Sequence, residues 1–229
     1  MKSEPRLSRL KAVIFDMDGL VLDTESTYFA AWQQAAAKMA FRLGDDFCLS
    51  LSGFDYGNVI ERVAAECGGH FDRDQFDRLS GICWREHVAT KGIAVKKGFS
   101  AMLRIVLDKQ LLFCLATNSL NHNALECLRY AGLDNTFPLV VSRDSVAKGK
   151  PAPDIFYRAA SLLNVPISSC LVVEDSRAGI LAAKQAGARI AFIPSVLPAA
   201  FDCVETADFT FTDLGQLAEF VRLNVFDPV

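Results

Sequence analysis

The sequence predicts an α/β fold built on a parallel sheet, and three observations support it. From about residue 95 onward, short apolar runs alternate with amphipathic stretches, which is typical of βαβ units. A separate apolar run, Ala12–Phe15, is rich in branched and aromatic residues and predicts one more buried strand. Residues 24–93 lie between these regions and show helical periodicity without a convincing strand. A parallel sheet with a helical insert after its first strand is therefore expected.

The helical insert is best explained as a second, smaller domain over the carboxyl edge of the sheet. Its expected helices are Tyr28–Ala40, Gly57–Cys67 and Asp72–Val88. We accordingly expect a core domain formed by residues 1–22 and 95–229, and a helical cap domain at residues 23–94.

The core elements follow in a regular order after the insert. Glycines at 132 and 187 stand where helices ending at Tyr130 and Ala186 would be capped. Pro153 is expected in the first turn of another helix, where its missing N–H costs nothing. The expected strands are Ala12–Phe15, Leu111–Leu115, Phe137–Val141, Cys170–Val173, Ile190–Ile193 and Phe209–Phe211.

Composition restricts the class of protein and its partners. A hydrophobic content of 51% suits a substantial core, and a net charge of −3 with interspersed acids and bases argues against nucleic-acid or membrane partners. Met1–Lys11 has no apolar segment typical of a secretory signal. Seven dispersed cysteines without CxxC spacing indicate a reducing, cytoplasmic location, and three distant histidines argue against zinc. Both a monomer and a dimer remain open.

The end of the first strand carries the most informative residues. Asp16-Met17-Asp18-Gly19 follows Phe15, and ligands in open parallel sheets bind outside the carboxyl ends of strands. One side chain and one backbone carbonyl from this loop can bind a shared cation. Asp16 could then act as a nucleophile and Asp18 as an acid/base. The alternative is a strand that ends in an Asx turn, which Asp and Gly favour.

Three further polar clusters are expected at the same edge of the sheet: Thr117-Asn118, Lys150 and Glu174-Asp175. Together with Asp16 and Asp18 they match the parts of phosphoryl transfer, in which catalysis is chiefly positioning and electrostatics. Glu174 and Asp175 would complete an oxygen cage for Mg²⁺. Thr117 and the N–H groups after it would hold a phosphate, and Lys150 would add a positive charge.

Each cluster also has a structural interpretation. Thr117, Asn118 and Ser119 could cap the following helix, and Lys150 could lie in a solvated loop. Glu174 and Asp175 could stabilise a helix N-terminus through their charge. The arrival of all four clusters at successive strand ends, in a workable order, favours the catalytic interpretation.

These residues resemble the four motifs of the haloacid dehalogenase superfamily, in its helical-cap phosphatase branch, which also contains β-phosphoglucomutase and phosphoglycolate phosphatase. The resemblance covers nearly the whole chain. The motifs are Phe15 to Glu25 (FDMDGLVLDTE), Ala116 to Ser119 (ATNS), Gly149 to Phe156 (GKPAPDIF) and Val173 to Gly179 (VEDSRAG).

The resemblance implies a Rossmann-like core, a four-helix cap and Mg²⁺-dependent chemistry through Asp16. It implies metal ligation by Asp16, the Asp18 backbone carbonyl and Asp175, with Glu174 at or just outside the ligand sphere. Dehalogenases proper lack an acid at the position of Asp18, so dehalogenation is disfavoured.

The cap positions differ from those of β-phosphoglucomutases, which carry a histidine in the first cap helix and an arginine in the substrate loop. Tyr28 and Tyr56 are the closest positions here, so a bidentate grip on a second phosphate is lost. Candidate substrate contacts are Phe54, Asp55, Tyr56, Asn118, Ser119 and Asn121, whereas His122 is expected at the surface.

The expected function is therefore a Mg²⁺-dependent phosphatase that hydrolyses a small, sugar-like phosphate monoester through an aspartyl-phosphate. A sugar phosphomutase is the alternative. A catalytically silent binding protein is disfavoured by the intact set of Asp16, Asp18, Lys150 and Asp175.

Overall fold

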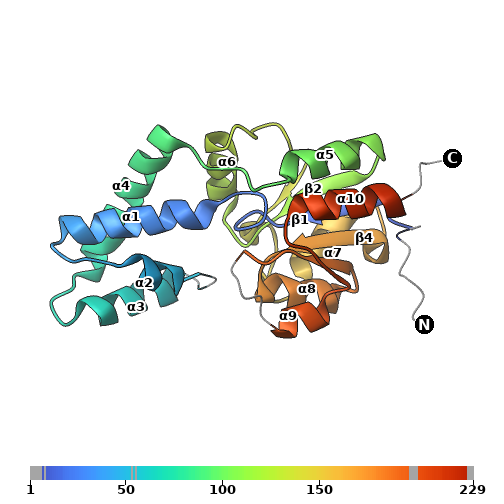
Figure 1. Cartoon of the computed structure of the whole chain (residues 1–229). Coiled ribbons are helices and arrows are strands. Elements are labelled where there is room, and N and C mark those ends of the chain that lie inside the picture. The colour runs from blue at the N-terminus through green and yellow to red at the C-terminus, as the bar shows by residue number, and fades with distance from the viewer. Residues whose placement is uncertain (1–6, 8, 53, 55, 196–200, 226–229) are drawn as a thin grey trace. The chain divides into compact units, whose positions relative to one another are not determined.

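The structure is a computed structural model that describes residues 7, 9–52, 54, 56–195 and 201–225. The chain divides into two compact units, Met1–Leu22 with Val95–Val229, and Asp23–Ala94. Figure 1 colours the chain from blue at the N-terminus to red at the C-terminus, so the helices of the second unit run from blue to green.

The first unit contains a parallel six-stranded sheet among the described residues, as the sequence predicts. The strand order is β3-β2-β1-β4-β5-β6, which is the order of a Rossmann-like fold. Its strands are β1 (Ala12–Phe15), β2 (Leu112–Ala116), β3 (Val140–Val141), β4 (Cys170–Glu174), β5 (Arg189–Phe192) and β6 (Phe209–Thr210).

β1 lies between the two halves of the sheet and is fully buried. Ile14 is paired with Cys114 of β2 on one side and with Val172 of β4 on the other. The direction in which strands are added reverses at β1, and such a reversal opens a crevice at the carboxyl ends of the strands. The ends of β1, β2 and β4 are therefore the expected place for a ligand site.

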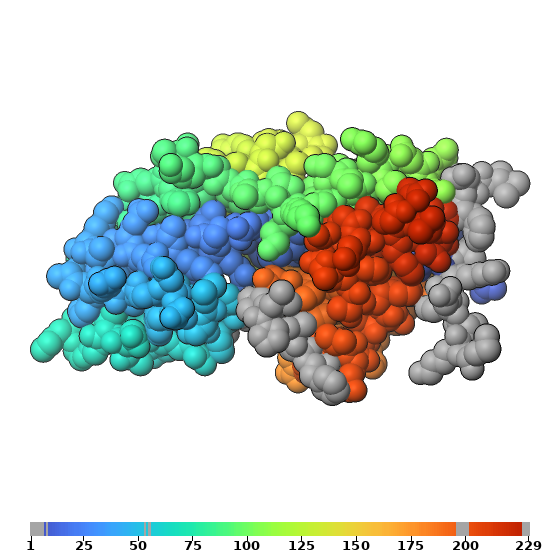
Figure 2. Space-filling model, viewed as in Figure 1, coloured from blue at the N-terminus to red at the C-terminus, as the bar shows by residue number. Residues whose placement is uncertain are grey.

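Helices cover both faces of this sheet. Ile14 belongs to a buried cluster with Phe156 of α7 (Asp154–Leu162) and Ala183 of α8 (Arg177–Ala186). Phe15 instead contacts Phe99 of α5 (Phe99–Asp108) edge to face at 6.0 Å. Successive residues of a strand point to opposite faces, so α7 and α8 cover one face and α5 the other. α10 lies beside α5 (Figures 1 and 2). The core helices are α5 (Phe99–Asp108), α6 (Asn121–Tyr130), α7 (Asp154–Leu162), α8 (Arg177–Ala186), α9 (Phe201–Thr206) and α10 (Leu214–Asn224), with 3-10 turns η1 (Arg143–Ser145) and η2 (Ile167–Ser169).

The helix ends agree with the sequence with one adjustment. Gly132 and Gly187 have φ values of 69° and 77°, the left-handed conformation that glycine tolerates at a helix end. Ser176 caps α8, its side chain accepting a hydrogen bond from the N–H of Gly179. Pro153 precedes α7 as its N-cap residue instead of lying in the first turn.

The third strand is shorter than expected. The sequence predicts a strand at Phe137–Val141, but only Val140 and Val141 pair with β2. Pro138 has no N–H for a strand ladder. Phe137 is buried against the rings of Phe15, Phe99 and Phe113, so it fills a packing site instead of pairing.

The described residues of the second unit form helices joined by loops, and no strand is found among them. Three helices correspond to the expected ones, and a short fourth helix, which the sequence periodicity did not reveal, joins them. Trp84 donates to Thr27 Oγ1 at 3.0 Å, and the ring of Tyr28 stacks on Trp84 at 5.7 Å, which ties the first helix to the last. The helices are α1 (Thr24–Lys38), α2 (Asp45–Leu49), α3 (Tyr56–Cys67) and α4 (Arg73–Lys91).

The cysteines agree with the expectation from composition. All seven cysteines, which lie among the described residues, are free, and Cys114 and Cys170 are buried inside strands as small apolar side chains. Within the described ranges, no helix combines the length and the apolar character that a membrane span requires.

Candidate active site

Asp16 and Asp18 lie in the loop that follows β1. The N–H of Asp16 donates to the carbonyl of Val173 at 3.0 Å, which continues the pairing with β4 as far as Asp16. Gly19 then turns the chain with a φ of 80°. A Cβ at Gly19 would also overlap the carboxylate of Asp175, so only glycine fits here for both reasons.

Lys150 is buried, and its ammonium group is surrounded by acceptors. Nζ donates to the carbonyl of Ala116 at 2.8 Å, to Glu174 Oε1 at 2.6 Å and to Asp16 Oδ1. Burial alone would lower the pKa of Lys150, but the carboxylates of Asp16 and Glu174 outweigh it and raise that pKa above its usual value. The lysine is therefore a fixed positive charge, and the solvated-loop interpretation is wrong for its side chain.

For the carboxyl group of Asp16, the effect of burial on the pKa is larger than that of the neighbouring charge of Lys150. Burial raises its pKa well above the usual value, the attraction of Lys150 opposes this, and the charges of Glu174 and Asp18 add to the increase. One lysine thus faces several carboxylates in a site with little access to water. The group carries an excess of negative charge that a cation would balance.

Glu174 is completely buried at the end of β4. While Oε1 accepts from Lys150, Oε2 accepts from the N–H of Asp175 at 3.2 Å and from the N–H and hydroxyl of Ser176 at 3.2 and 2.9 Å. A Cβ at Gly179 would overlap this carboxylate. Glu174 thus contacts Lys150, as a residue of the catalytic site would, and also the start of α8, as a residue that stabilises a helix N-terminus would.

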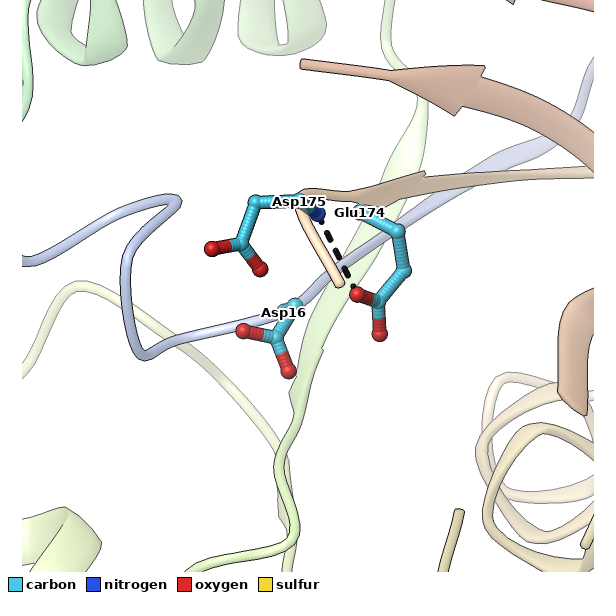
Figure 3. Close-up of side chains that lie close together, drawn as sticks. All are labelled: Asp16, Glu174 and Asp175. Atoms are coloured by element: carbon cyan, nitrogen blue, oxygen red, sulfur yellow. Dashed lines mark hydrogen bonds between the residues drawn. The ribbon is translucent and has the colours of Figure 1, made fainter. Parts of the chain in front are cut away.

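Three carboxylates converge at the edge of the sheet (Figure 3). One oxygen each from Asp16, Glu174 and Asp175 lie within 4.8 Å of one another. Hard divalent cations prefer such carboxylate oxygens, completed by a backbone carbonyl and water. The donor set and its excess negative charge therefore fit a divalent cation.

Asp18 is linked to the end of β2. Its Oδ2 accepts hydrogen bonds from Thr117 Oγ1 at 3.1 Å and from Ser119 Oγ at 2.9 Å. The N–H of Ser119 donates to Thr117 Oγ1 at 3.0 Å, which fixes the threonine hydroxyl. The structure thus brings the carboxylate of the first motif together with the hydroxyls of the second, and Thr117 is completely buried.

The polar residues after β2 do not cap α6. The N-cap of α6 is Leu120, which has no side-chain capping bond, and the N–H of Asn121 donates to Asp144 Oδ1 at 3.0 Å. Asn118 uses its amide on the backbone of Lys150. Asn121 is exposed, as is His122, which agrees with the surface position expected for the histidine.

Sequence reasoning missed three residues that build this site. Asp144 supports the start of α6, while Gly149 and Gly179 allow other groups to approach closely. Both glycines fall inside the motifs quoted above, and that membership was the available signal. For Asp144, the only signal in the sequence was that Ser142 stands two residues earlier. In the structure the hydroxyl of Ser142 donates to Asp144 Oδ1 at 2.7 Å.

The predicted residues of the helical unit are engaged within that unit. The guanidinium of Arg62 lies over the ring of Phe54 at 3.9 Å. The hydroxyl of Tyr56 lies 2.8 Å from Asp77 Oδ1 and 2.9 Å from Ser80 Oγ, and burial raises the pKa of Tyr56 to about 12. Asp55 lies outside the described residues.

Comparison with known proteins agrees with this geometry. The family profile described as "Hydrolase: haloacid dehalogenase-like hydrolase" matches residues 10–187. A phosphorylated carbohydrates phosphatase of Thermotoga maritima is 32% identical over 182 residues, which cover 78% of this chain and 82% of that protein. The β-phosphoglucomutase of Bacillus subtilis is 30% identical over 185 residues, 78% of this chain and 80% of that protein.

A solved structure has the same fold over nearly the whole chain. It is a Thermotoga maritima protein provisionally assigned as a β-phosphoglucomutase, with a TM-score of 0.82 and 26% identity, covering 93% of this chain and 99% of that one. The profile match spans most of the chain and includes every motif of the site. The chain therefore belongs to the family of haloacid dehalogenase-like hydrolases.

Proposed function

We propose that this protein is a Mg²⁺-dependent phosphatase that hydrolyses a small, sugar-like phosphate monoester through an aspartyl-phosphate at Asp16. One observation carries the proposal: the buried carboxylate of Asp16 is held by Lys150 beside Glu174 and Asp175, with Asp18 two residues away. A nucleophile, a fixed positive charge, an acidic metal site and an acid/base are thus gathered at one sheet edge.

In the first step, Asp16 attacks the phosphorus atom of the ester. A new bond forms between a carboxylate oxygen and phosphorus, and the bond from phosphorus to the ester oxygen breaks. Asp18 gives a proton to the departing oxygen, which leaves as an alcohol. Lys150 stabilises the charge on the transferring phosphoryl group while it keeps Asp16 in place.

In the second step, water attacks the phosphorus of the aspartyl-phosphate. Asp18 takes the proton from that water, the bond between Asp16 and phosphorus breaks, and inorganic phosphate leaves. Thr117 and Ser119 hold the Asp18 carboxylate by two hydrogen bonds and so keep it aimed at one place. Asp18 thereby serves as the acid in one step and as the base in the other.

We assign the metal site to Asp16, Glu174, Asp175 and the backbone carbonyl of Asp18. When bound there, Mg²⁺ would neutralise the repulsion between the carboxylates and a phosphate dianion. Glu174 also accepts hydrogen bonds from Lys150 and Ser176, so we assign it a less direct part in binding the cation than Asp16 and Asp175.

We assign substrate selection to residues 23–94, as the cap domain, with Phe54 and Tyr56 as candidate reading residues. The Thermotoga maritima relative is named for phosphorylated carbohydrates, and the 28% identical hexitol phosphatase A of Escherichia coli is named for a sugar alcohol. These names support a small phosphorylated metabolite as substrate. Seven free cysteines support a reducing cytoplasm as location.

A sugar phosphomutase is the second candidate, because the Bacillus subtilis relative carries that name. The residues at the two distinguishing cap positions favour hydrolysis, since Tyr28 stacks between Trp32 and Trp84 and Tyr56 bonds Asp77 and Ser80. Neither tyrosine offers the charged grip on a second phosphate that an arginine would.

The test is phosphate release from a panel of phosphorylated sugars, polyols and short acids, with Mg²⁺ and with EDTA. We expect Mg²⁺-dependent release concentrated on a few related compounds. Isomerised product with little free phosphate would instead establish the mutase, and neither product from any compound would contradict both.

A further inference from the structure

The side-chain amide of Asn118 holds both polar groups of the Lys150 backbone. The N–H of Lys150 donates to Asn118 Oδ1 at 2.8 Å, and Asn118 Nδ2 donates to the carbonyl of Lys150 at 3.0 Å. The two residues are 32 positions apart, so this is a tertiary link between two motifs. A single amide thus fixes the peptide unit on each side of the Lys150 Cα.

The same segment also holds the other end of Lys150. Nζ donates to the carbonyl of Ala116 at 2.8 Å, and Ala116 is the last residue of β2, two positions before Asn118. The exit of β2 therefore contacts the lysine at its ammonium group and at its backbone. Contacts at both ends of the lysine thus determine where Nζ lies relative to Asp16 and Glu174.

The neighbouring loop is packed to permit this contact. A Cβ at Gly149 would overlap Asn118 Oδ1 and the side chain of Arg143. The N–H of Arg143 donates to the carbonyl of Ser119 at 3.0 Å, which joins the same two segments a second time. The loop before Lys150 can therefore approach Asn118 this closely because residue 149 is a glycine.

We propose that Asn118 is a positioning residue that acts through Lys150, and not a group that contacts the substrate. This inference rests on the proposed function and deepens it. Asn118 is an exposed residue and its two hydrogen bonds to Lys150 are part-buried, so their loss should lower the stability of the fold only modestly. A small displacement of a group that must face the reacting atoms nevertheless lowers the rate strongly.

The experiment is a double-mutant cycle on phosphate release from p-nitrophenyl phosphate with Mg²⁺. It compares the unmodified enzyme, Asn118→Ala, Lys150→Ala and the double variant. Gln185→Ala is the matched control. Gln185 Nε2 donates to the carbonyl of Pro151 at 3.2 Å, so this substitution removes a similar side-chain contact from the residue next to Lys150.

We expect Asn118→Ala to lower kcat/KM by about 10- to 100-fold with little change in the melting temperature. In the Lys150→Ala background the same substitution should change kcat/KM by less than about 3-fold, because the group it positions is gone. Gln185→Ala should stay within about 3-fold of the unmodified enzyme. An equal loss in both backgrounds would mean that Asn118 acts on the substrate directly and would overturn the proposal.

A second measurement does not depend on activity or on the folding of Lys150→Ala. Amide hydrogen exchange followed by NMR should be at least about tenfold faster at the Lys150 N–H in Asn118→Ala, and unchanged in Gln185→Ala. Unchanged exchange in Asn118→Ala would overturn the inference even if the enzyme proves inactive. Absence of any phosphate release from the unmodified enzyme, with exchange as expected, would instead count against the proposed function alone.

Discussion

Gly179 lies so close to the carboxylate of Glu174 that a Cβ atom at this position would overlap it. The glycine is in the first turn of α8, and the glutamate is completely buried at the end of β4. The missing side chain therefore leaves the space in which Glu174 meets Lys150. This relationship explains why the fourth motif carries a glycine inside a helix, where glycine is otherwise unfavourable.

Gly179→Ala should be destabilising although alanine favours helices. The added methyl group must displace Glu174 from its contacts with Lys150 and Ser176, and such overpacking typically costs about 1–3 kcal/mol. We expect a lower midpoint in urea unfolding and at least about a tenfold lower kcat/KM. Gly81→Ala is the control, because the nearest atom to its Cβ would be 3.7 Å away in the side chain of Arg85. That variant should gain up to about 1 kcal/mol, and equal effects of the two substitutions would contradict the packing argument.

Asp16→Asn should abolish turnover and leave the fold intact. Asparagine has nearly the same shape but cannot form an acyl phosphate, so kcat should fall by about 10³-fold or more. Lys150 keeps its contacts with Glu174 and Ala116, and burial already opposes the charge of Asp16. We therefore expect the free energy of unfolding to stay within about 1 kcal/mol. Residual turnover near the level of the unmodified enzyme would exclude Asp16 as the nucleophile.

Mg²⁺ should stabilise the protein through the three converging carboxylates. At a concentration 100-fold above its Kd, a ligand that binds only the folded state adds about 2.7 kcal/mol to the free energy of unfolding. Asp175→Asn should reduce this gain, since it removes charge from one of the three carboxylates. Calorimetry with Mg²⁺ and with EDTA measures the difference. Asp46→Asn, an exposed position in the helical unit, should retain the full gain; equal gains in both variants would argue against this metal site.

Tyr56→Ala should change the preference among sugar phosphates but spare slow hydrolysis of p-nitrophenyl phosphate. Tyr56→Phe separates the ring from the hydroxyl, which contacts Asp77 and Ser80. The phenylalanine variant should lose about 1 kcal/mol of stability while keeping the preference, if the ring is the part that reads the substrate. Relative kcat/KM values on two sugar phosphates test this, and an equal loss on every ester would remove Tyr56 from substrate selection.

Much of the sheet could be predicted because its strands are short and apolar, and two of them, β1 and β4, are fully buried. In a chain that alternates strands and helices, the short apolar runs at Ala12–Phe15 and Cys170–Val173 indicate buried strands. The third strand is the exception: Phe137 is as apolar as its neighbours, but it packs among rings from three other segments. Residue type alone does not distinguish a paired strand residue from a packed one.

The chemical residues of the site could be predicted, but their supporting contacts could not. Asp16 and Glu174 stand at the ends of β1 and β4, and topology brings the ends of adjacent parallel strands together, whereas Lys150 reaches them from the loop after η1. The use of the Asn118 amide on Lys150, or of Asp144 on Asn121, depends on the detailed path of loops that are far apart in sequence. The short helix α2 likewise has too few residues to show a periodicity of its own.

The most direct test of nucleophilic attack by Asp16 is to trap the covalent intermediate. Enzyme turning over a phosphate ester with Mg²⁺ would be quenched and reduced with borohydride, which converts an acyl phosphate to an alcohol, and then digested for mass spectrometry. We expect homoserine in place of aspartate at position 16, and no such conversion in Asp16→Asn. Full phosphate release with an unmodified Asp16, or the same conversion at another carboxylate, would contradict it.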